Sequence, residues 1–374
     1  MKKHFLGGLT AQQFLKEYWQ KKPLLIRNAF PGFTGVLTPD EIAGLACSDD
    51  MQSRLVTEKS GKWKLLNGPF AEEDFAKLPK TKWSLLVQGI NNAVPEASQL
   101  LHEFNFIPHA RLDDIMVSYA PKNGGIGPHF DSYDVFLLQG DGHKRWQVST
   151  QLDMALIPDA PLRILQNFQP EAEWIVGPGD LLYLPPRYAH YGVALDDCTT
   201  YSIGFRAPST QELATQFLVF LEDRIHLEGI YQDPNLAVQK HPAEIGGKMI
   251  QQVENMLKQI RWDREDIIDF LGQYLSEPKS HIFFDAPTPP LTQSRFTKHY
   301  DSHGIRLALQ SQMLFQGHTL FLNGEAFIVS QASIECLANL ADNRTLAPGE
   351  ARDQETLALL YQWYASGYID FIEP

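Results

Sequence analysis

The chain of 374 residues is predicted to have an α+β fold, with a small β-barrel, a helical region and a C-terminal domain of winged-helix type. Between about residues 115 and 207, short apolar or β-branched runs alternate with turns, which is typical of a barrel or sandwich. After Pro208, apolar residues recur at helical intervals. A proline-rich stretch at 284–290 then precedes helices that flank a hairpin signal. The chain is long enough for two or three domains of roughly 100 to 200 residues each.

The N-terminal segment mixes short helical and extended patterns. Gln12 to Trp19 carries an amphipathic helical pattern. The run Pro39-Asp40-Glu41 predicts the start of another helix, because proline is tolerated in a first turn. We expect this part of the chain to cover one face of the barrel.

Six barrel strands are predicted, because six short apolar or β-branched runs are bounded by turn residues. They cover Ile115 to Tyr119, Val135 to Gln139, Arg145 to Val148, Glu173 to Val176, Leu181 to Leu184 and Tyr201 to Phe205. The glycine-rich run from Gly124 to Gly127 lies between the first two strands. It lacks the lysine and the strand-to-helix context of a phosphate-binding loop, so we predict a mobile loop beside an active site.

Three helices are predicted after the barrel. Ser209 and Glu212 have capping-box spacing and open a helix whose apolar stripe continues until Gly229. Two more helical patterns run from Ala243 to Gln259 and from Asp263 to Leu275. Their apolar stripes can pack on the barrel, which is the default, or on a second copy of the chain. A helical insert between two domains is a common dimer surface.

A separate small domain is predicted after the three prolines at 284–290, which cannot continue a helix or a sheet interior. Its hairpin signal is Asn323-Gly324, because this pair meets the positive φ angles of a two-residue turn. The expected elements are strands at 319–322 and 326–329, a helix capped by Ser330 up to about Leu340, a helix at 354–366 and a strand at 368–372. These helices offer few exposed Arg or Lys, so we expect a structural or protein-interaction role and no direct DNA binding.

Composition restricts the class of protein. The net charge of −13 disfavours nucleic-acid binding, which depends on clustered Lys and Arg. It favours a basic partner, although many enzymes are equally acidic for solubility alone. No long apolar stretch predicts a membrane span, and the N-terminus lacks the apolar core of a secretion signal. Three widely separated cysteines, Cys47, Cys198 and Cys336, indicate a reducing compartment, and we expect a cytoplasmic protein.

A metal site is predicted from His129, Asp131 and His190. Two histidines and one carboxylate form the ligand set of mononuclear iron(II) oxygenases. Alternate residues of a strand point to the same face, so His129 and Asp131 are predicted to reach one metal from one strand while Phe130 turns away. The third ligand must come from another strand.

The segment from Gly179 to His190 contains a turn, a short apolar run, a Pro-rich turn and the histidine. It resembles the second cupin motif, with Arg187 at the position where glycine is usual. In that family the two motifs face each other across a small barrel. This resemblance implies that His190 lies opposite His129 and Asp131.

An iron ion held by three residues keeps positions open for a 2-oxo acid and for dioxygen. A 2-oxoglutarate co-substrate also needs a cation for its far carboxylate, and Lys144 is the candidate, since it lies in the strand region after the first motif. Arg145 alternates to the opposite face if the strand is regular. Ser118 on the preceding strand and Tyr201 or Ser202 on the last strand are candidate hydroxyl donors for the same pocket.

These motifs together resemble the JmjC-type ribosomal oxygenases, in particular the bacterial arginine hydroxylases of that family. The likeness rests on Gly127 to Phe136, Lys144 to Trp146, Gly177 to His190 and Ser202 to Pro208, and extends over the whole chain. It implies a JmjC/cupin-type double-stranded β-helix that uses Fe(II), 2-oxoglutarate and O2. It also implies a homodimer formed through the helical middle. Members closest to this arrangement can have arginine at the Lys144 position, and either cation can serve.

The resemblance further implies a substrate and a division into domains. The implied reaction hydroxylates the β-carbon of an arginine in a large-subunit ribosomal protein, number sixteen of that subunit. The expected domains are a JmjC catalytic domain at 1–208 with its core at about 100–208, a helical dimerisation region at 209–280 and a winged-helix-like domain at 281–374.

An arginine substrate needs a carboxylate or several carbonyls to offset the lost hydration of its guanidinium. By position, the candidates are Asp113, Asp114 and Asp134, of which Asp134 is expected at the barrel mouth. Tyr133 is a candidate to pack flat against the guanidinium. The sequence does not choose among the three acids.

The sequence leaves three other functional hypotheses open. One is a JmjC or cupin oxygenase that hydroxylates or demethylates another protein side chain, such as lysine or histidine. Another is a metal-binding cupin without redox chemistry, although such proteins usually carry further His or Glu ligands. The third is a transcriptional regulator whose winged domain binds DNA, which the acidic charge disfavours.

Overall fold

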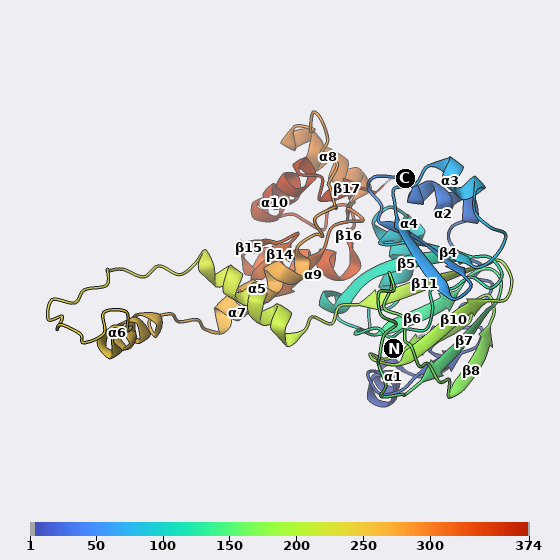
Figure 1. Ribbon diagram of the computed structural model, residues 1–374. Helices are drawn as coiled ribbons and strands as arrows, with labels where there is room; N and C mark the ends of the chain where they lie inside the picture. The colour runs from blue at the N-terminus through green and yellow to red at the C-terminus, as the bar shows by residue number, and fades with distance from the viewer. Residues whose placement is uncertain (1–3, 373–374) are drawn as a thin grey trace.

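The barrel is a double-stranded β-helix made of a large and a small antiparallel sheet (Figure 1). The computed structural model describes residues 4–372. The eight strands of the large sheet follow the order β1-β9-β6-β11-β5-β4-β2-β3. In chain order their bounds are β1 Leu24–Ile26, β2 Ser53–Lys59, β3 Lys62–Asn67, β4 Trp83–Val87, β5 Leu112–Ala120, β6 Val135–Gln139, β9 Leu181–Leu184 and β11 Cys198–Phe205.

The small sheet has the order β10-β7-β8, with β7 at Lys144–Ser149, β8 at Ala172–Val176 and β10 at Ala189–Ala194. All six predicted barrel strands are confirmed within a few residues, and β6 and β9 have the predicted bounds. The sequence patterns missed β10, which contributes the metal-ligand candidate His190.

The N-terminal segment does more than cover a face of the barrel, so that expectation is incomplete. Its strands β2, β3 and β4 extend the large sheet beyond β5, and β1 pairs with β9 at the other edge. The predicted helices are present as α1 at Ala11–Glu17 and α2 at Pro39–Ala46, each with a threonine capping box. The shorter helices are η1 His4–Leu6, α3 Glu72–Ala76, η2 Ile90–Asn92, α4 Pro95–His102 and η3 His109–Arg111.

The N-terminal helices bury the outer face of the large sheet. The ring of Phe14 on α1 lies 5.0 Å from that of Tyr183 on β9, and Phe104 after α4 lies 4.8 Å from Phe136 on β6. All four rings are fully buried. Side chains alternate along a strand. The residues next to Tyr183 on β9 and next to Phe136 on β6 therefore face the other side of the sheet, into the barrel.

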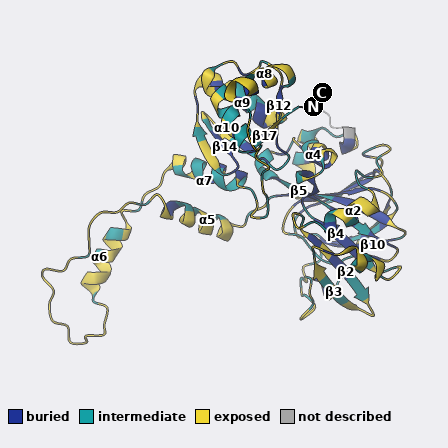
Figure 2. Ribbon diagram, turned by 90° about the horizontal axis from the view of Figure 1, so that it is seen from above, coloured by how far each residue is buried: buried dark blue, intermediate teal, exposed yellow. Residues whose placement is uncertain are grey.

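The helical region projects away from the barrel (Figure 1). It contains α5 at Thr210–Glu222, α6 at Gly247–Leu257 and α7 at Arg264–Ser276. The first helix ends sooner than predicted, and residues 223–246 form no regular helix or strand. Figure 2 shows that α6, which follows this segment, is largely exposed and lies away from the barrel.

The C-terminal domain has the winged-helix architecture that the sequence predicts. The hairpin β14 at Thr319–Leu322 and β15 at Glu325–Ile328 turns at Asn323 and Gly324, both with positive φ. Ser330 caps α9 at Gln331–Asn343. The other elements are α8 Gln293–His303, β12 Ile305–Leu307, β13 Met313–Gln316, β16 Thr345–Leu346, α10 Gln354–Ala365 and β17 Ile369–Phe371.

Direct hydrogen bonds join the C-terminal domain to the barrel and to α7. The amide of Gln312 donates to the carbonyl of His109 at 3.2 Å, and the backbone N–H of Gly324 donates to the hydroxyl of Ser276 at 3.0 Å. Arg206, just after β11, donates to the carbonyl of Leu275 at 2.8 Å. The end of α7 is therefore fixed from both sides. Across residues 4–372, no helix combines the length and apolar character needed to cross a bilayer.

Candidate metal centre

The two sequence motifs are hydrogen-bonded to each other through the backbone. His129 and His190 exchange two bonds, with N···O distances of 2.9 and 2.8 Å. The N–H of Arg187 donates to the carbonyl of Asp131 at 2.8 Å. Arg187 has a φ of 66°, in the left-handed region that favours glycine, which is the residue usual at this point of the cupin motif. The departure in residue type therefore preserves the turn.

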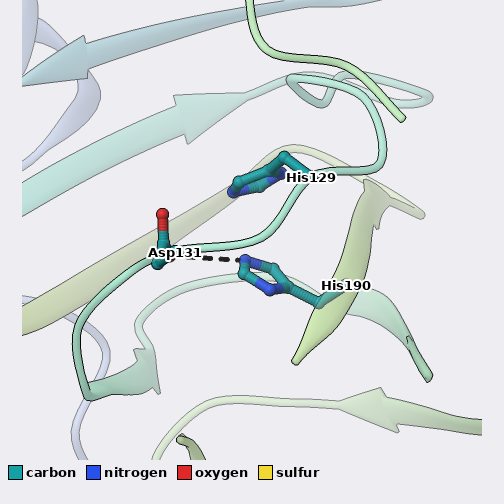
Figure 3. A group of neighbouring side chains, drawn as sticks. All are labelled: His129, Asp131 and His190. Atoms are coloured by element: carbon teal, nitrogen blue, oxygen red, sulfur yellow. Dashed lines mark ion pairs between the residues drawn. The ribbon is translucent and has the colours of Figure 1, made fainter. Parts of the chain in front are cut away.

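The three side chains converge on one point (Figure 3). Their ligand atoms all lie within 4.8 Å of one another, and His190 Nε2 is 3.7 Å from Asp131 Oδ2. The Nδ1 of His129 lies 3.0 Å from the carbonyl of Gly127, and the Nδ1 of His190 lies 2.9 Å from that of Tyr188. A carbonyl can only accept, so each Nδ1 carries the proton and each Nε2 keeps a lone pair for a metal.

Burial favours the metal-binding form of His190, because burial and then the neighbouring His129 lower its pKa to about 4. The expected strand geometry of the first motif is wrong. His129 forms an isolated β-bridge and Asp131 lies in a loop. The conformation of this loop, and not the alternation of a regular strand, therefore brings the two side chains together. The third candidate does come from a strand, β10.

The candidate ligands lie in a cavity of about 650 Å³ inside the barrel. Its wall combines residues of both sheets with the glycine-rich segment, at Gly125 and Ile126, and with the loop between β7 and β8. The glycine-rich run therefore lies beside the candidate site, as predicted, and its mobility stays a prediction.

Lys144 lines this cavity and is 6% exposed. Its Nζ donates to Thr200 Oγ1 at 3.3 Å and lies 5.1 Å from the centre of the Trp146 ring. Within the described part of the chain it forms no ion pair with a carboxylate, and burial lowers the pKa of its ammonium. Arg145 points outward, with Nε 3.9 Å from Glu173, as alternation predicts.

Trp146 supplies a buried polar atom that lacks a hydrogen-bond partner within the described residues. Its indole Nε1 is buried and has no hydrogen-bond acceptor among residues 4–372, although the residue lines the cavity. A buried cation without a carboxylate partner and a buried N–H donor without an acceptor are costly, unless an anionic ligand with acceptor oxygens binds there. The cavity is therefore suited to a carboxylate ligand beside the metal position.

The predicted hydroxyl donors divide between the two faces of the large sheet. Ser118 on β5 and Ser202 on β11 line the cavity. Tyr201 points away from the cavity, and its hydroxyl accepts hydrogen bonds from Val36 and Leu37, so its expected place in the pocket is wrong. Thr200, which is not among the predicted site residues, lines the cavity instead and contacts Lys144.

Asp113, Asp114 and Tyr133 also line the cavity. Asp114 is 5% exposed, and its two oxygens each lie 2.9 Å from the amide Nε2 of Gln88. The tyrosine is 40% exposed, so it lies where the cavity opens to solvent.

The expected position of Asp134 at the barrel mouth is wrong. This residue is fully buried on the other side of β6 and does not line the cavity. Its carboxylate accepts hydrogen bonds from the Tyr183 hydroxyl at 2.6 Å and from Gln20 at 2.9 Å, and Arg111 lies 3.7 Å away. These partners give Asp134 a structural role.

Sequence reasoning missed Gln88, Trp146 and Lys279 at this site. Trp146 could have been predicted from the sequence, since a side chain two residues after Lys144 on a strand points to the same face as Lys144. Gln88 and Lys279 contact Asp114 from distant parts of the chain, at 2.9 and 3.0 Å, and no spacing rule predicts such contacts.

Comparisons with known proteins agree with this architecture. The JmjC domain model matches residues 99–213, and a ROXA-like winged-helix model matches residues 259–370. Ribosomal protein uL16 3-hydroxylase of Escherichia coli is 33% identical over 366 residues, which cover 96% of this chain and 97% of that protein. A probable ribosomal oxygenase of Haemophilus influenzae is 46% identical over 232 residues, which cover 61% of this chain and 55% of that protein.

Solved structures of YcfD, a ribosomal oxygenase from E. coli, are similar to this chain over nearly its whole length. One X-ray structure gives a TM-score of 0.85. Another, in complex with cobalt and 2-oxoglutarate, gives a TM-score of 0.83 at 32% identity and covers 97% of this chain and 98% of that one. From the sequence match over almost the full length of both chains, together with the JmjC domain and this fold, we conclude that the chain belongs to the JmjC-domain ribosomal oxygenases.

Proposed function

We propose that this chain is an iron(II)- and 2-oxoglutarate-dependent hydroxylase that acts on the β-carbon of an arginine in ribosomal protein uL16. The observation that carries the proposal is one cavity that joins a two-histidine, one-carboxylate cluster to a buried lysine, which has no carboxylate partner among residues 4–372. The E. coli relative is named a uL16 3-hydroxylase, and carbon 3 of an amino acid is its β-carbon. A ribosomal substrate implies action in the cytoplasm.

The residues present are suited to both groups. His129, Asp131 and His190 would hold the metal, since each histidine keeps its Nε2 lone pair while Nδ1 is bonded to a carbonyl. Iron(II) suits this ligand set and, when bound, supplies the activation of dioxygen that couples 2-oxoglutarate oxidation to C–H hydroxylation. The relative's structure with cobalt and 2-oxoglutarate supports the same pair of ligands here.

Lys144 would bind the far carboxylate of 2-oxoglutarate. The negative charge would stabilise the ammonium that burial disfavours, and this charge-assisted hydrogen bond is stronger than a neutral one. Ser118 and Ser202 line the same cavity and can donate further hydrogen bonds, whereas the Thr200 hydroxyl donates to Gln139 Oε1 at 3.2 Å and accepts from Lys144. The indole N–H of Trp146 can donate to the same ligand, which would give this buried group its missing acceptor.

The substrate guanidinium would pair with Asp114. Besides Asp131, the cavity-lining acids among residues 4–372 are Asp113 and Asp114, and Asp114 is the more buried. A buried carboxylate gives a strong, directional contact to a guanidinium, because water competes little there. Tyr133 at the cavity opening would pack against the planar group, and the apolar wall at Met116 would contact the methylenes.

The function is tested by succinate formation from 2-oxoglutarate, measured with and without a uL16 peptide that contains the candidate arginine. We expect the peptide to stimulate turnover and to gain one oxygen atom per succinate formed. Turnover that no uL16 peptide stimulates would refute uL16 as substrate. Absence of turnover by iron-loaded protein would refute the oxygenase reaction itself.

We also propose that the chain forms a homodimer through its helical region. An apolar face on α6 is exposed, with Met249 at 45%, Ile250 at 56%, Val253 at 38% and Leu257 at 59%. Further exposed apolar side chains lie on α5 and in the irregular segment 223–246, among them Leu218, Val219, Ile230, Val238 and Ile245. Exposed apolar surface of this extent marks interaction sites in soluble proteins.

The double variant Ile250→Asp, Val253→Asp is expected to halve the mass in solution, from twice 42.4 kDa to 42.4 kDa. Two charges on this face would each lose solvation in a dimer, at a cost of several kcal/mol. Light scattering after size-exclusion chromatography measures the mass. Gln251→Asp adds a charge without removing an apolar side chain and should remain dimeric. A monomeric wild-type protein would contradict the dimer proposal.

A further inference from the structure

Lys279 connects the segment after α7 to the acidic residues of the barrel. Its Nζ lies 3.0 Å from Asp113 Oδ1 and 3.0 Å from Asp114 Oδ2. It therefore bridges the carboxylate of Asp113 and that of Asp114, the proposed partner of the substrate guanidinium. The sequence separation of 165 residues between Lys279 and Asp114 makes this contact a product of the fold.

Lys279 approaches these acids from outside the substrate cavity. Asp113 and Asp114 line the cavity, whereas Lys279 lines two neighbouring clefts beside Arg206 and Glu277. The lysine therefore leaves the cavity face of Asp114 free. Each carboxylate oxygen offers about two lone-pair sites, so Gln88 and Lys279 together leave Asp114 able to accept from a guanidinium.

The ion pairs of Lys279 with Asp113 and Asp114 reduce the repulsion between the two carboxylates. The carboxylates of Asp113 and Asp114 are adjacent, and the side chain of Asp114 is 7% exposed, so two unpaired negative charges there would repel each other. Arg206 contributes at a longer distance, with Nε 3.6 Å from Asp113. Burial alone would lower the pKa of Lys279, but Asp114 and Asp113 raise it above its ordinary value, so the lysine is a stable cation here.

The C-terminal domain helps to fix the position of Lys279. The Ser276 hydroxyl, three residues earlier, accepts from the backbone N–H of Gly324 in the β14–β15 turn at 3.0 Å. On the other side of the lysine, His281 Nδ1 lies 3.2 Å from Gln52 Nε2 on the barrel. The turn of the hairpin and the barrel thus hold the two ends of the segment that carries the lysine.

We propose that Lys279 is a positioning residue that holds the Asp114 carboxylate in the orientation that receives the substrate guanidinium, so that the C-terminal domain takes part in substrate recognition. This inference rests on the proposed arginine hydroxylation. It assigns a function to the contact between the winged-helix domain and the barrel, which the metal centre does not require.

The test compares wild-type protein with Lys279→Met, Lys279→Arg and the control Lys77→Met. Lys77 forms an exposed ion pair with Asp74, away from the cavity. Steady-state kinetics give KM and kcat for the uL16 peptide, and succinate formed without peptide reports the folded, co-substrate-binding barrel. Lys279→Met should raise the peptide KM roughly 10- to 100-fold, because a charged hydrogen-bond partner of Asp114 is lost. The kcat and peptide-independent turnover should change little.

Lys279→Arg should restore most of the affinity, and Lys77→Met should behave as wild type. Ser276→Ala should raise the peptide KM by a few-fold, since one neutral hydrogen bond to the C-terminal domain is lost. An unchanged or lower KM in Lys279→Met would overturn the inference, and a lower value would mean that the lysine competes with substrate. An unchanged KM in Ser276→Ala would overturn the contribution of the C-terminal domain. These outcomes can be distinguished from a failure of the proposed function, because in that case the wild-type protein itself would leave the arginine unmodified.

Discussion

Replacing Lys144 by methionine is expected to raise the KM for 2-oxoglutarate by roughly 30-fold or more, since truncating one partner of a buried charge pair costs about 2 kcal/mol or more. Methionine preserves most of the apolar stem, so the barrel should remain folded. The ammonium it removes is the buried cation of the cavity that lacks a carboxylate partner within the described chain. Succinate formation as a function of 2-oxoglutarate concentration measures the change.

Lys144→Arg is the matched control for charge, and it should keep much of the affinity because a guanidinium also binds a carboxylate. Lys64→Met, on strand β3 and absent from the cavity wall, controls for the loss of a lysine elsewhere in the barrel. An unchanged KM in Lys144→Met would mean that another group binds the far carboxylate. The assignment of the buried lysine would then be wrong.

His129→Ala is expected to reduce peptide hydroxylation by more than about 100-fold, because changing an outer-shell partner alone typically costs 10- to 100-fold in metal affinity or activity. The variant leaves two candidate ligands, Asp131 and His190, and the backbone bonds between the motifs can persist. Iron content after anaerobic loading and peptide mass measured together separate loss of metal from loss of chemistry.

His143→Ala controls for the loss of a histidine. His143 is exposed, pairs with Asp196 at 2.9 Å and lies outside the metal cluster, so this variant should keep its iron and its activity. If His129→Ala binds iron and hydroxylates peptide like the wild type, the three-residue metal centre is refuted.

The strands that the sequence predicts best are buried on both faces. Residues 135–138 and 181–184 are continuous apolar runs with turn residues nearby. They form most of β6 and all of β9, and both strands have the predicted bounds. The strand β10 was missed because its six residues include Gly192 and two alanines, which carry little strand preference. Its pairing with β7 supplies the stability that its own sequence does not indicate.

The errors about site residues follow from treating neighbours in sequence as neighbours in space. Asp134 lies just before β6, where Val135 and Leu137 face the cavity, so alternation sends Asp134 to the opposite side. The same rule separates Tyr201 from Ser202 on β11. Strand periodicity, applied more strictly, would have excluded both residues from the pocket.

The cluster of candidate metal ligands could be predicted from the sequence, because their residue types and spacing reflect coordination chemistry. The contacts of Asp114 were not, since Gln88 follows strand β4 and Lys279 follows helix α7. Only the three-dimensional arrangement brings them together. The sequence therefore indicates the cluster of candidate metal ligands better than it indicates the surroundings of Asp114.

Tandem mass spectrometry of a uL16 peptide, after incubation with iron(II), 2-oxoglutarate and the wild-type protein or His129→Ala, tests the central claim most directly. We predict a gain of one oxygen atom localised to the β-carbon of one arginine, present with the wild type and absent with the variant. An oxygen found on another residue, or an unmodified peptide despite succinate formation, would contradict arginine hydroxylation.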